Sequence, residues 1–433
     1  MATGDFNFTV KDREIMYRLI ISQLFYDGHQ NLAVSLATAV KAHPACSPSD
    51  RLMKVLHLGL REEEDYNDAQ KQALVLPGSG VDLEFETDVK SISPDAFQYQ
   101  TLYVTSHKGP CKVGIFHPKG NLVATGSEDC SIKVLDVNRM IAKADETEES
   151  EASKSSKEQM ESHPVIRTLY DHTAGVTCLD FHIASSVLIS GSTDRTVKVF
   201  DYSRSSTKKA QRSIQEAYPV KCLHLHPKCD WLLVGTEHPT MRLYDVTTQQ
   251  CFVGSNPKDQ HSGPITTCKW SMNAKMFATG SADGNIKLWD GVSNKCFCTF
   301  SGAHSGTEIV SVAFSRNSKY LLTAGMDSMV KLWELSTSRC LIAYTGAGTT
   351  GKMTTKTNAV FNHTEDYVLF PDERTTSLCC WDSRNAERQP LLSLSHNNCV
   401  TSMCHSPISA TFITCSDDNR MRFWHCRSAS ESI

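Results

Sequence analysis

Five stretches of the chain contain a histidine, an aspartate 22 or 23 residues later, and a serine or threonine four residues before that aspartate. A hydroxyl, an imidazole and a carboxylate can form a nucleophilic triad, in which the imidazole takes the proton of the hydroxyl. An enzyme needs its nucleophile at one place, so a set that occurs five times indicates a structural role. The five sets are His107, Thr125 and Asp129; His172, Ser190 and Asp194; His261, Thr279 and Asp283; His304, Thr323 and Asp327; and His396, Thr414 and Asp418.

We expect each set to form a chain of buried hydrogen bonds. The aspartate can accept from the imidazole, and the imidazole can contact the hydroxyl. In three sets the hydroxyl can also accept from an indole six residues after the aspartate, namely that of Trp289, Trp333 or Trp424. Such a chain satisfies polar groups that are shielded from water and joins a tight turn to the neighbouring strands.

The sets belong to a longer repeat, which predicts the fold. A phrase such as GSADGNIKLWD (280–290) occurs seven times, with a Leu or aromatic position at Leu135, Phe200, Tyr244, Trp289, Trp333, Trp381 and Trp424. These positions are 43 to 48 residues apart, except for one interval of 65 that shrinks to about 43 if the charged residues 141–162 are a disordered insertion. Seven such repeats resemble the WD40 family and predict an all-β, seven-bladed β-propeller over residues 99–427.

The sequence also predicts how the propeller closes. The strand-like segment YQTLYVTS (99–106) precedes the first histidine and has no blade of its own. An open sheet edge is a liability unless another strand covers it. We therefore expect 99–106 to be the outer strand of the seventh blade, beside residues 420–426.

Before the propeller we expect a small α-helical domain at residues 1–60 and an acidic linker at 61–98. The apolar residues Ile15, Leu19, Ile20 and Leu24 are spaced as one face of a helix. A unit of three short helices can bury little apolar area by itself. We expect this stripe to form a homodimer interface, and docking onto the same chain is the alternative.

The composition excludes several classes of protein. The 433 residues carry 44 Lys and Arg against 48 Asp and Glu, which argues against a general polyanion-binding surface. No apolar run is long enough to cross a membrane, and the charged start of the chain is unlike a signal peptide. The 17 cysteines include no CxxC pair and indicate buried thiols in a reducing compartment. We expect no cofactor, no metal site and no enzymatic activity.

The least uniform positions of the repeats predict where a partner binds. The seven tight turns should lie at one end of the central channel, and the residues beside each aspartate differ from repeat to repeat. A uniform framework with variable tips suits a docking surface. Blade 3, with Val234 and His238, and blade 6, with Pro371 and Thr375, lack the set, so their turns are either less rigid or modified to hold a partner. The partner-binding candidates are Glu128, Arg195, Glu237, Met326, Arg374 and Asn419.

Several phrases that blade geometry does not require carry a more specific resemblance. TSHKGP, HPVIRTLYDH and FNHTEDYVL make the chain similar to the WD-repeat subunits of cleavage stimulation factor, which acts in forming mRNA 3′ ends. The resemblance implies a non-catalytic scaffold subunit in nuclear pre-mRNA cleavage and polyadenylation, with helices that form a homodimer. It also implies that the propeller docks onto the factor's HAT-repeat scaffold subunit, and that RNA is bound mainly through an RRM-containing subunit.

Two other functions stay open. The residues WDSR (381–384) match the WDxR pattern of propellers that are substrate receptors of cullin-RING ubiquitin ligases, with Arg384 as the arginine. The other alternative is an enzyme that uses a propeller pocket. The sequence offers no unique nucleophile, metal set or cofactor loop for it.

Overall fold

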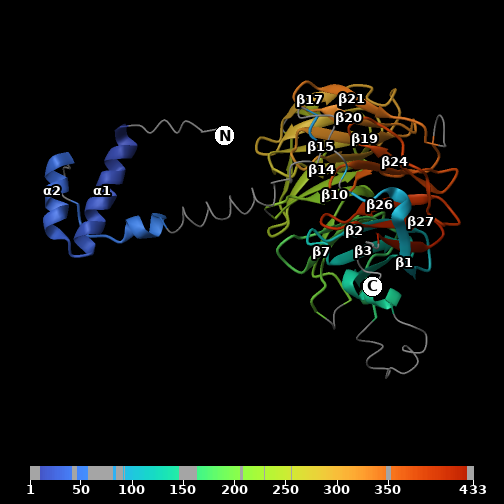
Figure 1. Ribbon diagram of the computed structural model, residues 1–433, viewed down its shortest axis with the longest axis horizontal. Coiled ribbons are helices and arrows are strands. Elements are labelled where there is room, and N and C mark those ends of the chain that lie inside the picture. The colour runs from blue at the N-terminus through green and yellow to red at the C-terminus, as the bar shows by residue number, and fades with distance from the viewer. Residues whose placement is uncertain are drawn as a thin grey trace. The chain divides into compact units, whose positions relative to one another are not determined.

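The computed structural model describes residues 10–40, 46–56, 81–83, 91, 93–145, 163–204, 208–228, 230–254, 256–347 and 353–426. The chain divides into two compact units, Met1–Leu74 and Val75–Ile433. Figure 1 shows helices in the first unit and a ring of strands in the second.

The first unit contains the three predicted helices, which are confirmed. They are α1 (Val10–Tyr26), α2 (Gln30–Val40) and a helical turn at 51–56. Gly28 adopts a φ of 82° between α1 and α2, where a side chain would be strained, and so lets the chain reverse. The two helices bury Ile21 and Ala33 completely.

The second unit is the predicted seven-bladed propeller, formed by seven four-stranded antiparallel sheets in the described residues. Blades 1 to 3 contain β2 (Cys111–Phe116), β3 (Leu122–Ser127), β4 (Ser131–Asp136) and β5 (Val165–Tyr170); β6 (Val176–Phe181), β7 (Val187–Ser192), β8 (Thr196–Asp201) and β9 (Arg212–Gln215); β10 (Val220–Leu225), β11 (Trp231–Thr236), β12 (Arg242–Asp245) and β13 (Cys251–Val253). Blades 4 to 6 contain β14 (Ile265–Trp270), β15 (Met276–Ser281), β16 (Ile286–Asp290) and β17 (Cys296–Phe300); β18 (Ile309–Phe314), β19 (Tyr320–Gly325), β20 (Val330–Glu334) and β21 (Arg339–Tyr344); β22 (Val360–Phe361), β23 (Tyr367–Pro371), β24 (Ser377–Asp382) and β25 (Leu392–Ser393).

Blade 7 closes the ring as predicted. It contains β26 (Val400–His405), β27 (Thr411–Ser416) and β28 (Arg420–Cys426), and its outer strand is β1 (Tyr99–Ser106) from the start of the propeller. Tyr99 pairs with Cys426, and Ser106 pairs with Arg420. The blade that holds the last strands of the ring thus also holds its first strand.

The hydrophobic core lies between neighbouring blades. Ile132 and Val134 of blade 1, for example, pack in one cluster with Val176 and Phe181 of blade 2. The second strand of each blade is sandwiched between neighbouring sheets, and all six residues of β3 are buried. Side chains on both faces of such a strand are shielded, which explains why its sequence is apolar or small at every position.

Two predicted segments differ in the structure. We predicted an acidic linker at 61–98, but Val81 lies in the core cluster with Tyr320 and Tyr344, with 1% of its surface exposed. The 3-10 helix η1 (Ala96–Gln98) also packs on the propeller through Ala96. A few apolar side chains in the acidic stretch suffice for this docking, and charge alone did not reveal them.

We predicted a disordered insertion at 141–162, but its first residues belong to the helix α4 (Val137–Asp145). Val137 and Met140 anchor this helix in a cluster with residues of blades 1 and 7. Residues 146–162 of the predicted insertion lie outside the described residues.

A second 3-10 helix, η2 (Pro257–Asp259), precedes blade 4. None of the helices that the structure describes combines the length and the apolar character needed to cross a bilayer.

Closure of the ring can be tested by truncation. A chain that begins at His107 lacks β1 and the buried Tyr99, so the edge of β28 and an inter-blade cluster are exposed. We expect it to melt at least about 5 °C below a chain that begins at Val81, because losing a buried aromatic residue alone costs about 3–5 kcal/mol. Circular dichroism during heating measures the difference. Equal melting temperatures would contradict the role of β1.

Candidate docking face of the propeller

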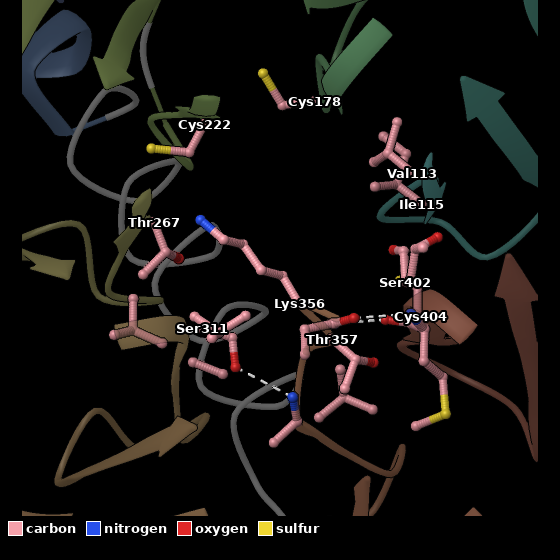
Figure 2. A pocket seen from close by; sticks show the side chains of 18 of the residues that line it. Val113, Ile115, Cys178, Cys222, Thr267, Ser311, Lys356, Thr357, Ser402 and Cys404 are labelled. Carbon is pink, nitrogen blue, oxygen red and sulfur yellow. Dashed lines mark hydrogen bonds between the residues drawn. The ribbon is translucent and has the colours of Figure 1, made fainter. Parts of the chain in front are cut away.

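The innermost strands of the blades surround a central channel of about 1450 Å³. Figure 2 shows its wall, which carries the thiols of Cys178, Cys222 and Cys404 among hydroxyl and aliphatic side chains. Burial raises the pKa of the Cys178 thiol to about 12, so it stays protonated at neutral pH and is a poor nucleophile. Among the residues described, no three His, Cys, Asp or Glu side chains are placed to hold a metal ion.

The predicted hydrogen-bond chain is complete in blades 4, 5 and 7. In blade 4, Trp289 Nε1–H donates to Thr279 Oγ1 at 2.8 Å, Thr279 Oγ1 lies 2.8 Å from His261 Nε2, and His261 Nδ1 lies 3.1 Å from Asp283 Oδ2. A carboxylate only accepts, so Nδ1 carries the proton and Nε2 accepts from the threonine hydroxyl. The same chain links His304, Thr323, Asp327 and Trp333 in blade 5, and His396, Thr414, Asp418 and Trp424 in blade 7.

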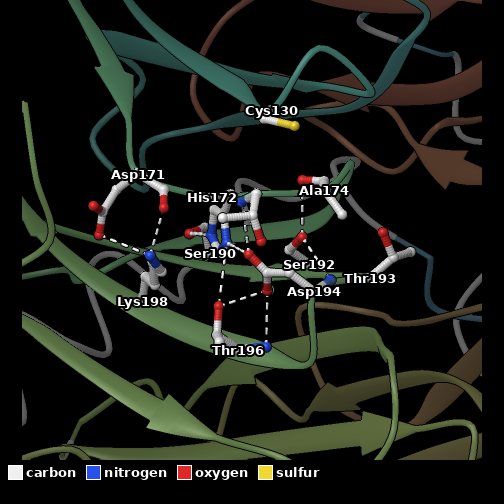
Figure 3. A network of polar contacts seen from close by, with 12 residues as sticks. Cys130, Asp171, His172, Ala174, Ser190, Ser192, Thr193, Asp194, Thr196 and Lys198 are labelled. Atoms are coloured by element: carbon white, nitrogen blue, oxygen red, sulfur yellow. Dashed lines mark hydrogen bonds and ion pairs between the residues drawn. The ribbon is translucent and has the colours of Figure 1, made fainter.

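Blades 1 and 2 form shorter versions, because Leu135 and Phe200 replace the tryptophan. In blade 2, His172 bridges Asp194 at 2.8 Å and Ser190 at 2.6 Å, as Figure 3 shows. In blade 1, His107 Nε2 lies 2.9 Å from Thr125, whereas Nδ1 reaches Ser131 Oγ at 3.0 Å and is 3.6 Å from Asp129. In this blade a serine therefore connects the histidine to the aspartate.

The Ser and Thr hydroxyls of these hydrogen-bond chains are buried and cannot act as nucleophiles on a substrate. The hydroxyl-bearing residues Thr125, Ser190, Thr279, Thr323 and Thr414 are all 0% exposed. In blades 1, 2, 4 and 7 the aspartate additionally accepts backbone N–H groups from both loops that it joins; Asp283, for example, accepts from Ser262 and Asn285 at 2.9 Å. The sets thus tie the loop that enters a blade to the tight turn between its second and third strands.

The ionisation of these groups favours the folded protein at neutral pH. Burial by itself would raise the pKa of Asp283, but the hydrogen bonds from His261 and from backbone N–H groups bring it well below the usual range. Burial lowers the pKa of His172 and His396, and their aspartates offset this only in part. Both kinds of group have a folded pKa below the unfolded one. Their contribution to stability is therefore full above the unfolded pKa and is lost as the pH falls through the folded pKa.

A repeated basic residue, which sequence analysis missed, supports the same loops. Four residues after the aspartate, a Lys or Arg donates to a backbone carbonyl just before the histidine; Lys287 Nζ donates to the Asp259 carbonyl at 2.9 Å, and Lys331 Nζ to that of Ala303 at 2.8 Å. The regular position in the repeat was the available signal. The other members are Lys133, Lys198 and Arg422.

Blade 3 replaces the set with another buried network. Glu216 stands where the other blades have histidine, 22 residues before His238. Tyr244 donates its hydroxyl to Glu216 at 2.7 Å, and Arg242 forms an ion pair with Glu216 at 3.0 Å. Arg242 occupies the position of the repeated lysine, so the basic side chain that elsewhere meets a carbonyl here neutralises a buried carboxylate.

Blade 6 replaces the set differently. Trp381 Nε1–H donates to the Thr345 carbonyl at 2.9 Å, and the turn is held by Asp372, which accepts from the Thr375 N–H at 2.9 Å. Neither blade 3 nor blade 6 leaves its turn without an internal network. Of the two explanations left open for these blades, loss of rigidity therefore has no support from the contacts.

Charged side chains ring the channel mouth at the end with the aspartate turns. Lys112 pairs with Asp417 at 2.8 Å and lies 3.7 Å from Glu128, and Lys221 pairs with Glu237 at 2.7 Å. Lys356 likewise pairs with Glu308. The lysines at this mouth are thus neutralised by neighbouring acids.

The structure divides the predicted partner-binding candidates into three groups. Glu128 and Glu237 precede the turn position and line the channel mouth. Arg195 and Asn419 follow it with positive φ. Arg195 and Arg374 are exposed, whereas Asn419 is half-buried. Met326 was a wrong choice as an exposed tip, because it is 7% exposed and packs with Tyr344 and Met353.

In the helical unit, the predicted stripe lies on α1. Ile15 is 57% exposed, and Leu19, Ile20 and Leu24 are half-buried. Further exposed apolar side chains lie on α2 and at 51–56; they are Leu32, Val34, Met53, Val55 and Leu56. So much exposed apolar surface on a small unit is typical of an interface.

Matches to known families fall in both units. The model of the cleavage stimulation factor subunit 1 dimerisation domain matches residues 8–64. The WD domain, G-beta repeat matches residues 99–136, 164–201 and 388–425, and the Vps8 beta-propeller matches residues 228–356.

Similar proteins include one that matches along the whole chain. Cleavage stimulation factor subunit 50 of Arabidopsis thaliana is 32% identical over 437 residues, which cover 98% of each chain. Pre-mRNA-processing factor 19 of Oryza sativa subsp. japonica is 30% identical over 201 residues, 46% of this chain and 33% of the relative. COMPASS component SWD3 of Saccharomyces cerevisiae is 27% identical over 206 residues, 46% of this chain and 57% of the relative.

The hydrogen-bond sets can be tested at Asp283. We expect Asp283→Ala to lower the free energy of unfolding by about 2–4 kcal/mol, because His261 and two backbone N–H groups lose their acceptor. Asp417→Ala, which removes a partly exposed carboxylate at the channel mouth, should cost less than about 1 kcal/mol. Denaturant unfolding measures both. An Asp283→Ala protein that unfolds like the wild type would refute the structural role.

Proposed function

We propose that the chain, which belongs to the family of cleavage stimulation factor subunit 50, is a non-catalytic docking subunit of that factor. It would act in the nucleus, in the cleavage and polyadenylation of pre-mRNA. The whole-length similarity to the Arabidopsis protein is the observation that carries this proposal.

The geometry supports docking rather than catalysis. Every hydroxyl of the repeated sets is buried and occupied by hydrogen bonds, so none can meet a substrate. The same sets fix the tight turns, whose tips carry different side chains in each blade. A rigid frame with variable tips lets several weak contacts act together on one partner.

We propose that the partner on the face with the aspartate turns is the HAT-repeat scaffold subunit of the factor. RNA would be bound mainly through an RRM-containing subunit. The neutralised lysines at the channel mouth support this division, since a nucleic-acid backbone needs unpaired cations.

The position of Arg384 argues against the alternative function, a substrate receptor of a ubiquitin ligase. Arg384 would have to present its guanidinium to the ligase, but its side chain is 6% exposed and forms an ion pair with the buried Asp366 at 3.2 Å. A side chain held inside the fold in this way serves the propeller itself.

We expect the helical unit to mediate homodimerisation through Ile15 and its neighbours. A fragment of residues 1–74 should sediment as a dimer at micromolar concentration. Ile15→Glu should weaken the dimer at least about tenfold, because a charge would be buried in an apolar interface. Asn31→Glu, at an exposed polar position, is the matched control. A wild-type fragment that is monomeric while fully helical would contradict the proposal.

The docking face can be tested by charge reversal. Arg195→Glu combined with Arg374→Glu should weaken capture of the purified HAT-repeat subunit about fivefold or more, which equals about 1 kcal/mol. Surface plasmon resonance measures the affinity, and an unchanged melting temperature would show that folding is intact.

The matched control reverses two exposed lysines at the opposite mouth, Lys119→Glu with Lys228→Glu. It should leave capture unchanged. If instead the control pair abolishes capture and the arginine pair does not, the partner binds the other face.

A further inference from the structure

One position of the repeat is glycine or alanine in blades 1, 2, 4 and 5, asparagine in blade 7 and tyrosine in blade 3. It lies two residues after the histidine, in the loop that enters the blade, and its members are Gly109, Ala174, Gly263, Gly306 and Asn398. A Cβ on Gly109 or Gly263 would come within 3.2 Å or 3.1 Å of the backbone nitrogen of the turn aspartate. In blades 1 and 4 the aspartate turn therefore packs closely on this position and leaves little room for a side chain, whereas a Cβ on Gly306 of blade 5 would meet no atom within 4 Å.

Blade 3 has Tyr218 at this position. Its loop is aligned with the others, because the Glu216 N–H donates to the Arg195 carbonyl at 2.8 Å, as the His107 N–H does to Asn419. Since Glu216 is satisfied by Arg242 and Tyr244, the turn residue His238 is not needed in the buried network. Its ring instead meets that of Tyr218, with centroids 5.1 Å apart and planes at 33°.

The Tyr218–His238 pair is accessible to a ligand, with Tyr218 exposed and His238 half-buried. Tyr218 keeps 43% of its surface exposed. The Thr240 N–H donates to His238 Nδ1 at 3.2 Å, so the neutral ring carries its proton on Nε2. Nε2–H has no acceptor among the residues that the structure describes.

Arg195 brings a positively charged side chain to the turn that contacts the loop of Tyr218. It lies at the tip of the blade 2 turn, has a φ of 63°, and is joined by its carbonyl to the loop of Tyr218. Within the described ranges its guanidinium makes no hydrogen bond or ion pair. A guanidinium of this kind is suited to bind a carboxylate with two parallel hydrogen bonds.

We propose that Tyr218, His238 and Arg195 bind a short linear segment of a partner protein, in which a carboxylate lies next to an aromatic or proline side chain. The apolar side chain would pack on the Tyr218–His238 pair, and the carboxylate would meet Arg195. This inference rests on the proposed function, because it names the chemistry that the docking face accepts.

A nucleic acid fits this site less well than an acidic peptide. Glu237 is exposed next to His238, and it pairs with Lys221, the cation that lines the nearby channel mouth. The site therefore presents one unpaired cation, whereas a phosphate backbone needs several in a row. A single carboxylate of a peptide needs only one such cation.

The test is fluorescence anisotropy of the full chain with labelled synthetic peptides. One peptide carries a phenylalanine–proline pair followed by aspartates, and a second has lysines in place of the aspartates. A single-stranded oligouridine RNA is the third ligand. We expect the aspartate peptide to bind at least about tenfold more tightly than the other two. Equal binding of the two peptides, or tighter binding of the RNA, would overturn the inference.

Variants locate the binding site. Tyr218→Ala and Arg195→Glu should each weaken the aspartate peptide about tenfold, whereas Tyr218→Phe keeps the ring and the affinity. Tyr170→Ala, which removes a tyrosine of similar exposure from the outer strand of blade 1, is the matched control and should leave the peptide affinity unchanged. If Tyr218→Ala does not fold, the affinity of the Arg195→Glu variant for the aspartate peptide tests the site by itself. Folded variants that bind like the wild type would overturn the inference.

Capture of the HAT-repeat subunit by the same proteins separates the two proposals. Selective peptide binding that is lost in the variants, without any capture of that subunit, would support the inference and contradict the proposed function. Capture of the subunit without selective peptide binding would do the reverse.

Discussion

The buried hydrogen bond between an aspartate and a histidine is the interaction on which the docking face depends. In blades 2, 4, 5 and 7 it joins two loops that belong to different ends of the blade sequence, and a hydroxyl extends it into the sheet. Because the donor and acceptor are shielded from water, neither can give up its partner without a desolvation penalty. The tips of the turns are thereby fixed while their exposed side chains remain variable.

The same constraint explains why blade 3 can differ. An accessible aromatic pair at Tyr218 and His238 requires that the turn residue be released from the buried network. Glu216, Arg242 and Tyr244 provide a replacement in which charge and hydrogen bonds are balanced inside the blade. One substitution alone would leave a buried carboxylate or arginine unpaired, which is strongly destabilising.

The fold could be predicted because its signals are repeated. The His–Asp spacing and the Trp position each occur several times, and the closing strand at 99–106 was the one segment left without a blade. Val81 and Met140 could not be predicted in the same way, because each lies outside the repeated phrases and its burial depends on contacts with distant blades. Met326 failed for a similar reason: its place in the turn suggested exposure, but its packing against Met353 follows from blades 5 and 6 together. The Glu216 network was hidden because a glutamate in place of histidine looks like the absence of a set.

The central claim is that the buried sets hold one face of the propeller ready for a partner. Hydrogen exchange of the full chain, measured with and without the HAT-repeat subunit, tests it most directly. We expect the partner to slow exchange in the loops around Arg195, Tyr218 and His238, while the strands that carry the sets exchange slowly in both states. Slowed exchange confined to the opposite turns, at residues 117–121 and 271–275, would contradict the claim.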